Sequence, residues 1–167
     1  MTTPGGPRYE DDFYAWTQYQ AEVLRSMPTP DNRFDREQVA EEIEDLGKCE
    51  RDAVLSRMRR IIEHFLKLSY SRAERPCFGS IEKIDEARET RSDKLTATLR
   101  CDVESSLGSL YEAGRRRAVR ALTRYDEPDN AEQLPSACPW SLDDIWREDG
   151  YPARPNAAGT QGSALPR

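Results

Sequence analysis

Three residues whose side chains can do chemistry follow one another at seven-residue spacing: Glu50, Arg57 and His64. His64 is the only histidine in the chain. On a helix this spacing places all three on one face, about 10 Å apart along the axis. A carboxylate, a guanidinium and an imidazole can bind an ion or a phosphate, or move a proton near neutral pH. His64, Arg57 and Glu50 are therefore candidates for catalysis, and the same three with Glu42 are candidates for binding.

These residues also have a structural interpretation, which we favour. They lie on an apolar stripe that helical periodicity directs towards a core, made of Val39, Ile43, Leu46, Val54, Ile61, Phe65 and Leu68. Charged groups in such a stripe need partners, so we expect a polar seam of ion pairs that fixes the register between helices, at modest or no net stability. Glu63 is expected on the opposite face of the helix.

The acidic residues could instead hold a metal ion, which we favour less. Glu42 with Glu41, Asp45 or Glu50 would offer oxygen ligands to Mg²⁺ or Mn²⁺. Glu50 and His64 are too far apart to share one ion unless the helix bends between them, because helix-borne Glu/His sites use spacings of three or four residues. We expect no metal ligands and no cofactor.

Arg59 and His64 form an Arg-x4-His element, and Arg60 is placed as well as Arg59 to accompany the histidine. The element resembles the motif of helical ribonucleases from bacterial toxin systems, in which arginine and histidine stabilise and protonate the scissile phosphate. A further basic cluster, at 115–117, Arg120 and Arg124, could hold phosphates, but we favour the placement of cations near a helix C-terminus.

The chain reads as helices with no strand pattern. We expect the first helix over 11–27, with its buried stripe at Phe13, Trp16, Val23 and Leu24. The second covers 35–70, with Asp35 as N-cap and Gln38 completing a capping box. Within it, we favour Gly47 as the close approach of a neighbouring helix, with a kink as the alternative.

Two more helices and an irregular segment complete the expected fold. A break at 76–79 precedes a third helix over 80–95, and a fourth covers 99–124. In the segment 134–146, Ser141 caps a helical turn that packs Leu142 and Ile145 against the bundle. The prediction is an all-α bundle of four main helices, with long second and fourth helices and a C-terminal capping segment.

Composition narrows the class of protein. The chain has 167 residues, 34% of them charged, and a net charge of −6. This predicts one helical domain over 9–152, with a flexible N-terminus at 1–8 and a disordered tail at 153–167. The absence of an apolar run long enough to span a bilayer and of a signal peptide predicts a cytoplasmic protein without a membrane partner. The four cysteines are scattered, which favours reduced, partly buried thiols, at Cys49, Cys77, Cys101 and Cys138.

Four segments in order are similar to one family: the opening helix at 9–16, the acidic segment at 35–51, the histidine segment at 61–67 and the closing motif at 134–142. Over about 9–152 the chain resembles the bacterial domain-of-unknown-function family twenty-nine. The resemblance implies an almost entirely helical protein and no assigned activity. The family pattern includes positions matching Glu41, Glu42, Gly47, Glu50, Arg57, His64 and Lys67. The chain departs from it at Leu68 and at 78–79, where members carry tryptophan, so the resemblance implies no aromatic wall beside His64.

Three functions remain open on this basis. We favour a binding or interaction module that self-associates through a long helix or takes a protein partner; nucleic acid is not the expected partner. The second is a metal-independent ribonuclease-like enzyme that uses His64 with Arg57, Arg59 or Arg60. The third is a metal-dependent hydrolase built on Glu42, Glu50 and His64.

Overall fold

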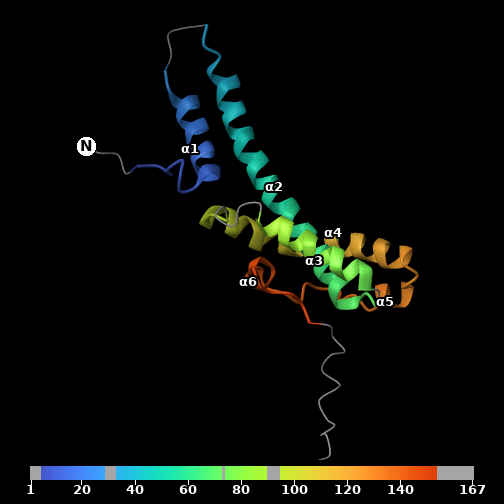
Figure 1. Cartoon of the computed structure of the whole chain (residues 1–167). Helices are drawn as coiled ribbons and strands as arrows, with labels where there is room; N and C mark the ends of the chain where they lie inside the picture. The colour runs from blue at the N-terminus through green and yellow to red at the C-terminus, as the bar shows by residue number, and fades with distance from the viewer. Residues whose placement is uncertain (1–4, 29–32, 73, 90–94, 154–167) are drawn as a thin grey trace, which may run out of the picture. The chain divides into compact units, whose positions relative to one another are not determined.

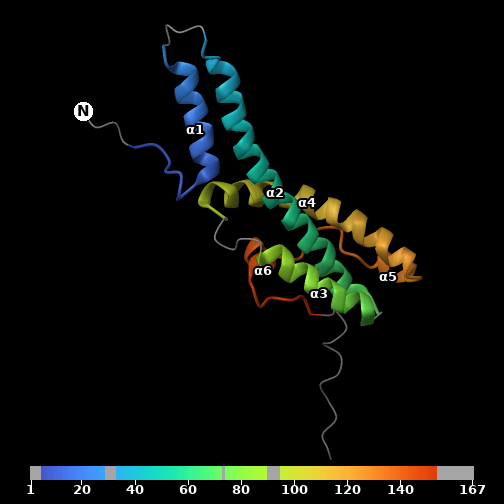
Figure 2. The same ribbon diagram turned by 45° about the horizontal axis from the view of Figure 1, so that its top comes forward.

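The computed structural model describes residues 5–28, 33–72, 74–89 and 95–153, and within them the chain is helical with no strand. The described residues form six helices, which are labelled in Figures 1 and 2. They are α1 (Phe13–Ser26), α2 (Arg36–Tyr70), α3 (Glu74–Glu89), α4 (Ala97–Arg124), α5 (Pro128–Glu132) and α6 (Leu142–Trp146). The all-α class and the two long helices, α2 and α4, are confirmed. The predicted flexible ends lie largely outside the described residues.

The chain divides into two compact units. Unit 1 comprises Met1–Ser56 and Arg91–Ser105, and unit 2 comprises Arg57–Thr90 and Ser106–Arg167. The long helices α2 and α4 each contribute residues to both. That the four main helices form one bundle, and one domain over 9–152, stays a prediction.

In unit 1, α1 runs beside the first part of α2 (Figure 1), and the contact depends on Gly47. A Cβ atom at this position would lie 2.0 Å from Oγ1 of Thr17, a buried residue of α1. Such a distance is far inside van der Waals contact, so only glycine lets the helices approach this closely. The helix continues unbroken through Gly47, and the predicted close approach is confirmed.

The predicted core stripe is wrong at two positions in this first part of α2. Val39 is 36% exposed and Leu46 is 59% exposed, whereas their neighbours Ala40 and Gly47 are buried. Val54, further along the predicted stripe, is buried as expected. The buried face is turned by about one residue, roughly 100°, from the face with the larger side chains. The reason is the close contact at Gly47, which needs small residues and therefore selects the face that carries them.

In unit 2 the second part of α2 lies against α4 and follows the predicted stripe. Ile61, Phe65 and Leu68 are buried. Gly114 is the counterpart of Gly47: its Cβ would lie 3.0 Å from Cγ2 of Ile62. The apolar side chains of this core are Met58, Ile62, Leu66, Ile84, Leu110, Tyr111, Ala118 and Leu122.

The third helix does not begin at residue 80, after the break that was predicted at 76–79. α3 starts at Glu74 and includes Pro76 and Gly79, and it ends at Glu89, so Leu95 lies outside it. Pro76 is the third residue of the helix, where its missing N–H has no intrahelical acceptor to lose. The proline therefore belongs to the first turn, and no break separates it from the helix.

The C-terminal segment is held by local capping and by α4. Ser141 and Asp144 form a reciprocal capping box at α6, and Leu142 and Ile145 are buried, which confirms the predicted turn. The short helix α5, with Pro128 in its first turn, was not predicted. Upstream of α6, Tyr111 and Arg115 both donate hydrogen bonds to the carbonyl of Pro135, at 2.7 and 2.9 Å.

Candidate functional site

The three candidate residues Glu50, Arg57 and His64 fall in different units. Glu50 is half-buried in unit 1, and Arg57 and His64 are half-buried in unit 2. A paired Glu50–Arg57–His64 seam stays a prediction. Within unit 2 the structure defines the surroundings of His64 in detail.

His64 contacts a buried hydroxyl. Its Nδ1 atom lies 3.1 Å from Oγ of Ser80 on α3, and Ser80 is 2% exposed. Burial of the ring, helped by the charge of Lys67, lowers the pKa of His64 to about 4. The imidazole is therefore neutral at pH 7. A serine beside a neutral histidine is the pattern of an activated nucleophile, but the buried Ser80 hydroxyl gives a substrate no access.

The same pKa bears on the ribonuclease interpretation. A general acid works best with a pKa near the operating pH, and a histidine with a pKa of about 4 carries no proton to donate at pH 7. Arg59 is half-buried and Arg60 is exposed. The arrangement does not favour protonation of a phosphate ester by His64.

The sequence predicts Glu63 on the face of α2 opposite to the core, but the structure shields this side chain. Its side chain is 14% exposed and pairs with Lys67, at 2.5 Å between Oε1 and Nζ, and Oε2 lies 3.9 Å from Nη1 of Arg117 on α4. The expectation failed because Gly114 brings α4 over this position: a Cβ there would lie 3.3 Å from the Glu63 backbone nitrogen. In unit 2 the ion pair of Glu63 and Lys67 thus lies next to His64.

Three of the acidic residues considered as metal ligands, Glu41, Glu42 and Asp45, are on the surface. Glu41 and Glu42 are exposed, and Glu42 accepts a hydrogen bond from Gln38 at 3.2 Å. Asp45 pairs with Lys48 at 3.0 Å. Among the residues that the structure describes, no group of three histidine, cysteine or carboxylate side chains could hold a metal ion. The geometry therefore offers the metal-dependent hydrolase no support in this part of the chain.

The arginines at the end of α4 differ in their surroundings. Arg115 donates to the carbonyls of Leu134 and Pro135, so it holds the C-terminal segment. Arg116, Arg120 and Arg124 are exposed. Arg120 and Arg124 form no ion pair within the described part of the chain.

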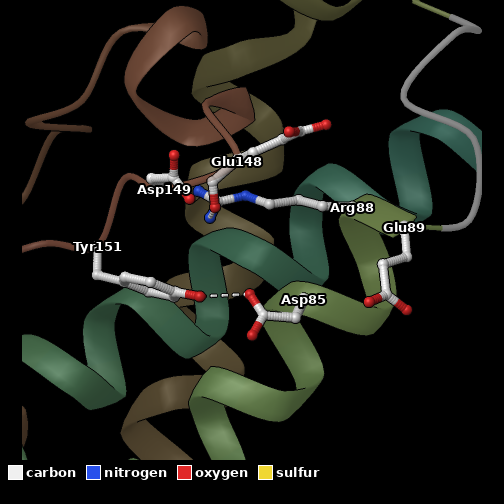
Figure 3. A pocket seen from close by; sticks show the side chains of 6 residues that line it. All are labelled: Asp85, Arg88, Glu89, Glu148, Asp149 and Tyr151. Atoms are coloured by element: carbon white, nitrogen blue, oxygen red, sulfur yellow. Dashed lines mark hydrogen bonds between the residues drawn. The ribbon is translucent and has the colours of Figure 1, made fainter.

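Unit 2 also contains an open hollow that the sequence analysis did not predict (Figure 3). Its volume is about 340 Å³. α3 contributes Asp85, Arg88 and Glu89, and the segment after α6 contributes the remaining lining residues, Glu148, Asp149 and Tyr151. The Tyr151 hydroxyl donates a hydrogen bond to Asp85, which raises the pKa of the tyrosine.

Arg88 forms the inner wall of this hollow and is 4% exposed. Its guanidinium donates to three main-chain carbonyls: to Ile145 at 2.8 and 3.2 Å, to Glu148 at 3.0 Å and to Gly150 at 2.8 Å. It also lies 5.4 Å from the ring centroid of Phe65 and 5.5 Å from that of Tyr151. Burial lowers the pKa of the guanidinium. Arg88 therefore anchors the C-terminal segment and has little hydrogen-bonding capacity left for a ligand.

The hollow can attract a cation through its four carboxylates, but it holds no pair of groups suited to proton transfer. Its lining has no histidine, serine or cysteine. The sequence carried one signal for Arg88: it follows Ile84 by four residues, on the same helix face, and Ile84 is buried. That signal is weak, because a basic residue in the last turn of a helix ordinarily faces solvent.

No helix in the described residues is long and apolar enough to cross a membrane. The sequence model described as "Domain of unknown function DUF29" matches residues 8–151. A solved structure from Rhodospirillum rubrum, described as an alpha-helical protein of unknown function, is 25% identical with a TM-score of 0.68. The match covers 87% of this chain and 92% of that one. No curated protein matches the chain.

Proposed function

We propose that this chain, which belongs to the DUF29 family of domains of unknown function, is a cytoplasmic protein-docking module that binds a second copy of itself. The docking surface is a row on the first part of α2, formed by Val39, Glu42 and Leu46, which we name the Val39–Leu46 row. Exposed free thiols at Cys49 and Cys101 fit a reducing compartment.

The exposure of large apolar side chains in unit 1 carries this proposal. Six of the eight exposed large hydrophobic residues in the described chain belong to unit 1, and two belong to unit 2. The six are Tyr9, Tyr19, Met27, Phe34, Val39 and Leu46. Exposed apolar area is unfavourable by about 25 cal/mol per Å², so a partner that covered Val39 and Leu46 would stabilise unit 1.

The spacing along α2 favours a helical partner. Val39, Ile43, Leu46, Glu50 and Ala53 alternate at four and three residues, the seam spacing of packed helices. Val39 and Leu46 are exposed, whereas Ile43 and Glu50 are half-buried beside them. A charged residue within such a seam sets the register of the pairing. Glu42 and Glu50 are thus the binding residues that we propose in unit 1.

The same spacing extends along the sequence of α2 to Arg57 and His64 in unit 2. We assign these two residues to polar contacts within unit 2, with no catalytic step. Supporting this assignment are the neutral state of His64 at pH 7 and its contact with a buried serine.

Light scattering on the purified full chain tests the proposal. The mean mass of the wild-type chain should rise with concentration, and Leu46→Ser should shift this rise to concentrations about tenfold higher or more, since it removes apolar area from the contact. Tyr125→Ser is the matched control, because Tyr125 is 48% exposed but belongs to unit 2. A wild-type chain that stays monomeric at every concentration would refute the proposal.

A further inference from the structure

The end of α4 carries an exposed row of arginines, which we name the arginine row: Arg116, Arg120 and Arg124. Their spacing of four residues places them along one side of the helix. From residue 112 to 124 the helix has five basic residues and one acidic residue, a net charge of +4. Arg116 makes only a long contact of 4.0 Å with Glu112, and the described residues give Arg120 and Arg124 no ion pair. The row is thus a cationic surface, and few carboxylates in the described residues neutralise its charge.

The Val39–Leu46 row has the opposite character. From residue 36 to 56, α2 has seven acidic residues and three basic ones, a net charge of −4. Glu42 lies beside Leu46 on the exposed side of the helix, and Asp45 lies next to it. The exposed apolar side chains are therefore bordered by carboxylates.

From this complementarity we infer that the arginine row of one copy covers the Val39–Leu46 row of a second copy. The inference rests on the proposed function and names the surface that binds the Val39–Leu46 row. Pairing two Val39–Leu46 rows would instead bring two acidic helix faces together, which like-charge repulsion disfavours. Arginine suits this position because its aliphatic stem packs on apolar side chains while its guanidinium binds carboxylates in a fork geometry.

Such a contact is heterologous, because two different surfaces of the same chain meet. It also contains exposed charges that salt screens. The association of the wild-type chain should therefore weaken as ionic strength rises. This dependence separates the contact from a purely apolar one.

A charge exchange tests the inference directly. One variant, Arg116→Glu with Arg120→Glu, reverses the arginine row, and the other, Glu42→Lys with Asp45→Lys, reverses the acidic border. Sedimentation velocity of the full chain at low ionic strength should show each variant associating at least tenfold more weakly than wild type. An equimolar mixture of the two should associate again, because each reversed surface now meets its complement on the other chain.

A control variant shows whether the effect is specific to the arginine row. Arg147→Glu, at an exposed arginine outside α4, should associate as wild type does. The inference is overturned if the equimolar mixture stays dissociated. It is also overturned if the charge-reversed variants associate like wild type while Leu46→Ser associates more weakly. Either result leaves the proposed docking function in place. If circular dichroism shows that a double variant does not fold, Arg116→Gln with Arg120→Gln takes its place. This neutral variant should abolish the salt dependence of self-association. A salt dependence that persists in it would overturn the inference. So would binding of a short RNA or DNA by the arginine row with unchanged self-association.

Discussion

Nδ1 of His64 and Oγ of Ser80 lie 3.1 Å apart, joining α2 to α3 inside unit 2. The histidine is held there as the neutral imidazole, because burial and the nearby charge of Lys67 lower its pKa from 6.5 to about 4. A neutral, half-buried imidazole bound to a buried hydroxyl is a structural contact. It links the state of protonation of this ring to the stability of the fold.

Acidification should therefore destabilise the protein. As the pH falls below about 6.5, the unfolded chain takes up a proton at His64 while the folded chain does not, until the pH nears 4. The contribution is fully present above pH 6.5 and is lost progressively down to pH 4. We expect a loss of about 1–2 kcal/mol, since the ring is only partly buried and solvent screens its charge.

Urea unfolding between about pH 7.5 and pH 5 measures this effect. His64→Gln is the comparison, because glutamine keeps a hydrogen-bonding group near Ser80 but does not titrate. Its stability should vary less over this range than that of the wild-type chain. Identical pH profiles for the two proteins would show that His64 does not carry the effect.

Gly47→Ala should destabilise the protein by about 1–3 kcal/mol, because the added methyl group would meet Oγ1 of Thr17 at 2.0 Å. Gly108→Ala is the matched control, since Gly108 lies in α4 with nothing within 4 Å of the added atom. That change should stabilise the helix by up to about 1 kcal/mol. Thermal melts of the two variants should shift in opposite directions, and a neutral Gly47→Ala would contradict the close contact between α1 and α2.

Arg88→Lys should release the C-terminal segment. Lysine keeps the charge but cannot donate to the carbonyls of Ile145, Glu148 and Gly150 together, so we expect a loss of about 2–4 kcal/mol. Hydrogen exchange should accelerate most at residues 142–151. Arg147→Lys, at an exposed arginine of the same segment, should change neither property. Unchanged exchange in Arg88→Lys would rule out the anchoring role.

Glu63→Gln should lower stability by about 1 kcal/mol, because it breaks a shielded ion pair with Lys67 and removes the charge that faces Arg117. Glu82→Gln, on the exposed surface of α3, should be neutral. Chemical denaturation of both variants checks the difference. Equal midpoints would indicate that the pair is screened like a surface one.

How far the sequence predicts this structure depends on how local each feature is. The turn capped by Ser141 was predicted correctly, since its determinants lie within four residues. The core positions Ile61 and Phe65 were also correct, because large apolar side chains there are buried in unit 2. Val39 and Leu46 were placed in the core by the same periodicity. The structure exposes them because Gly47 and Thr17 select a different face, a tertiary contact that periodicity does not contain.

The site was less predictable than the fold. His64 was identified correctly as a residue with special surroundings, but its partner Ser80 belongs to another helix. Arg88 was missed because its partners are main-chain carbonyls about sixty residues further along, which leave no trace in side-chain spacing. Contacts of this kind follow from tertiary packing alone.

The reactivity of Cys49 tests the central claim most directly, because this exposed thiol follows Leu46 by three residues on the proposed docking face. Cys101 is an exposed thiol elsewhere in unit 1 and serves as the internal reference. Alkylation of the wild-type chain, followed peptide by peptide in mass spectrometry, should slow at Cys49 and not at Cys101 as the protein concentration rises. Equal rates at Cys49 at every concentration, under conditions in which the chain associates, would contradict docking through the Val39–Leu46 row.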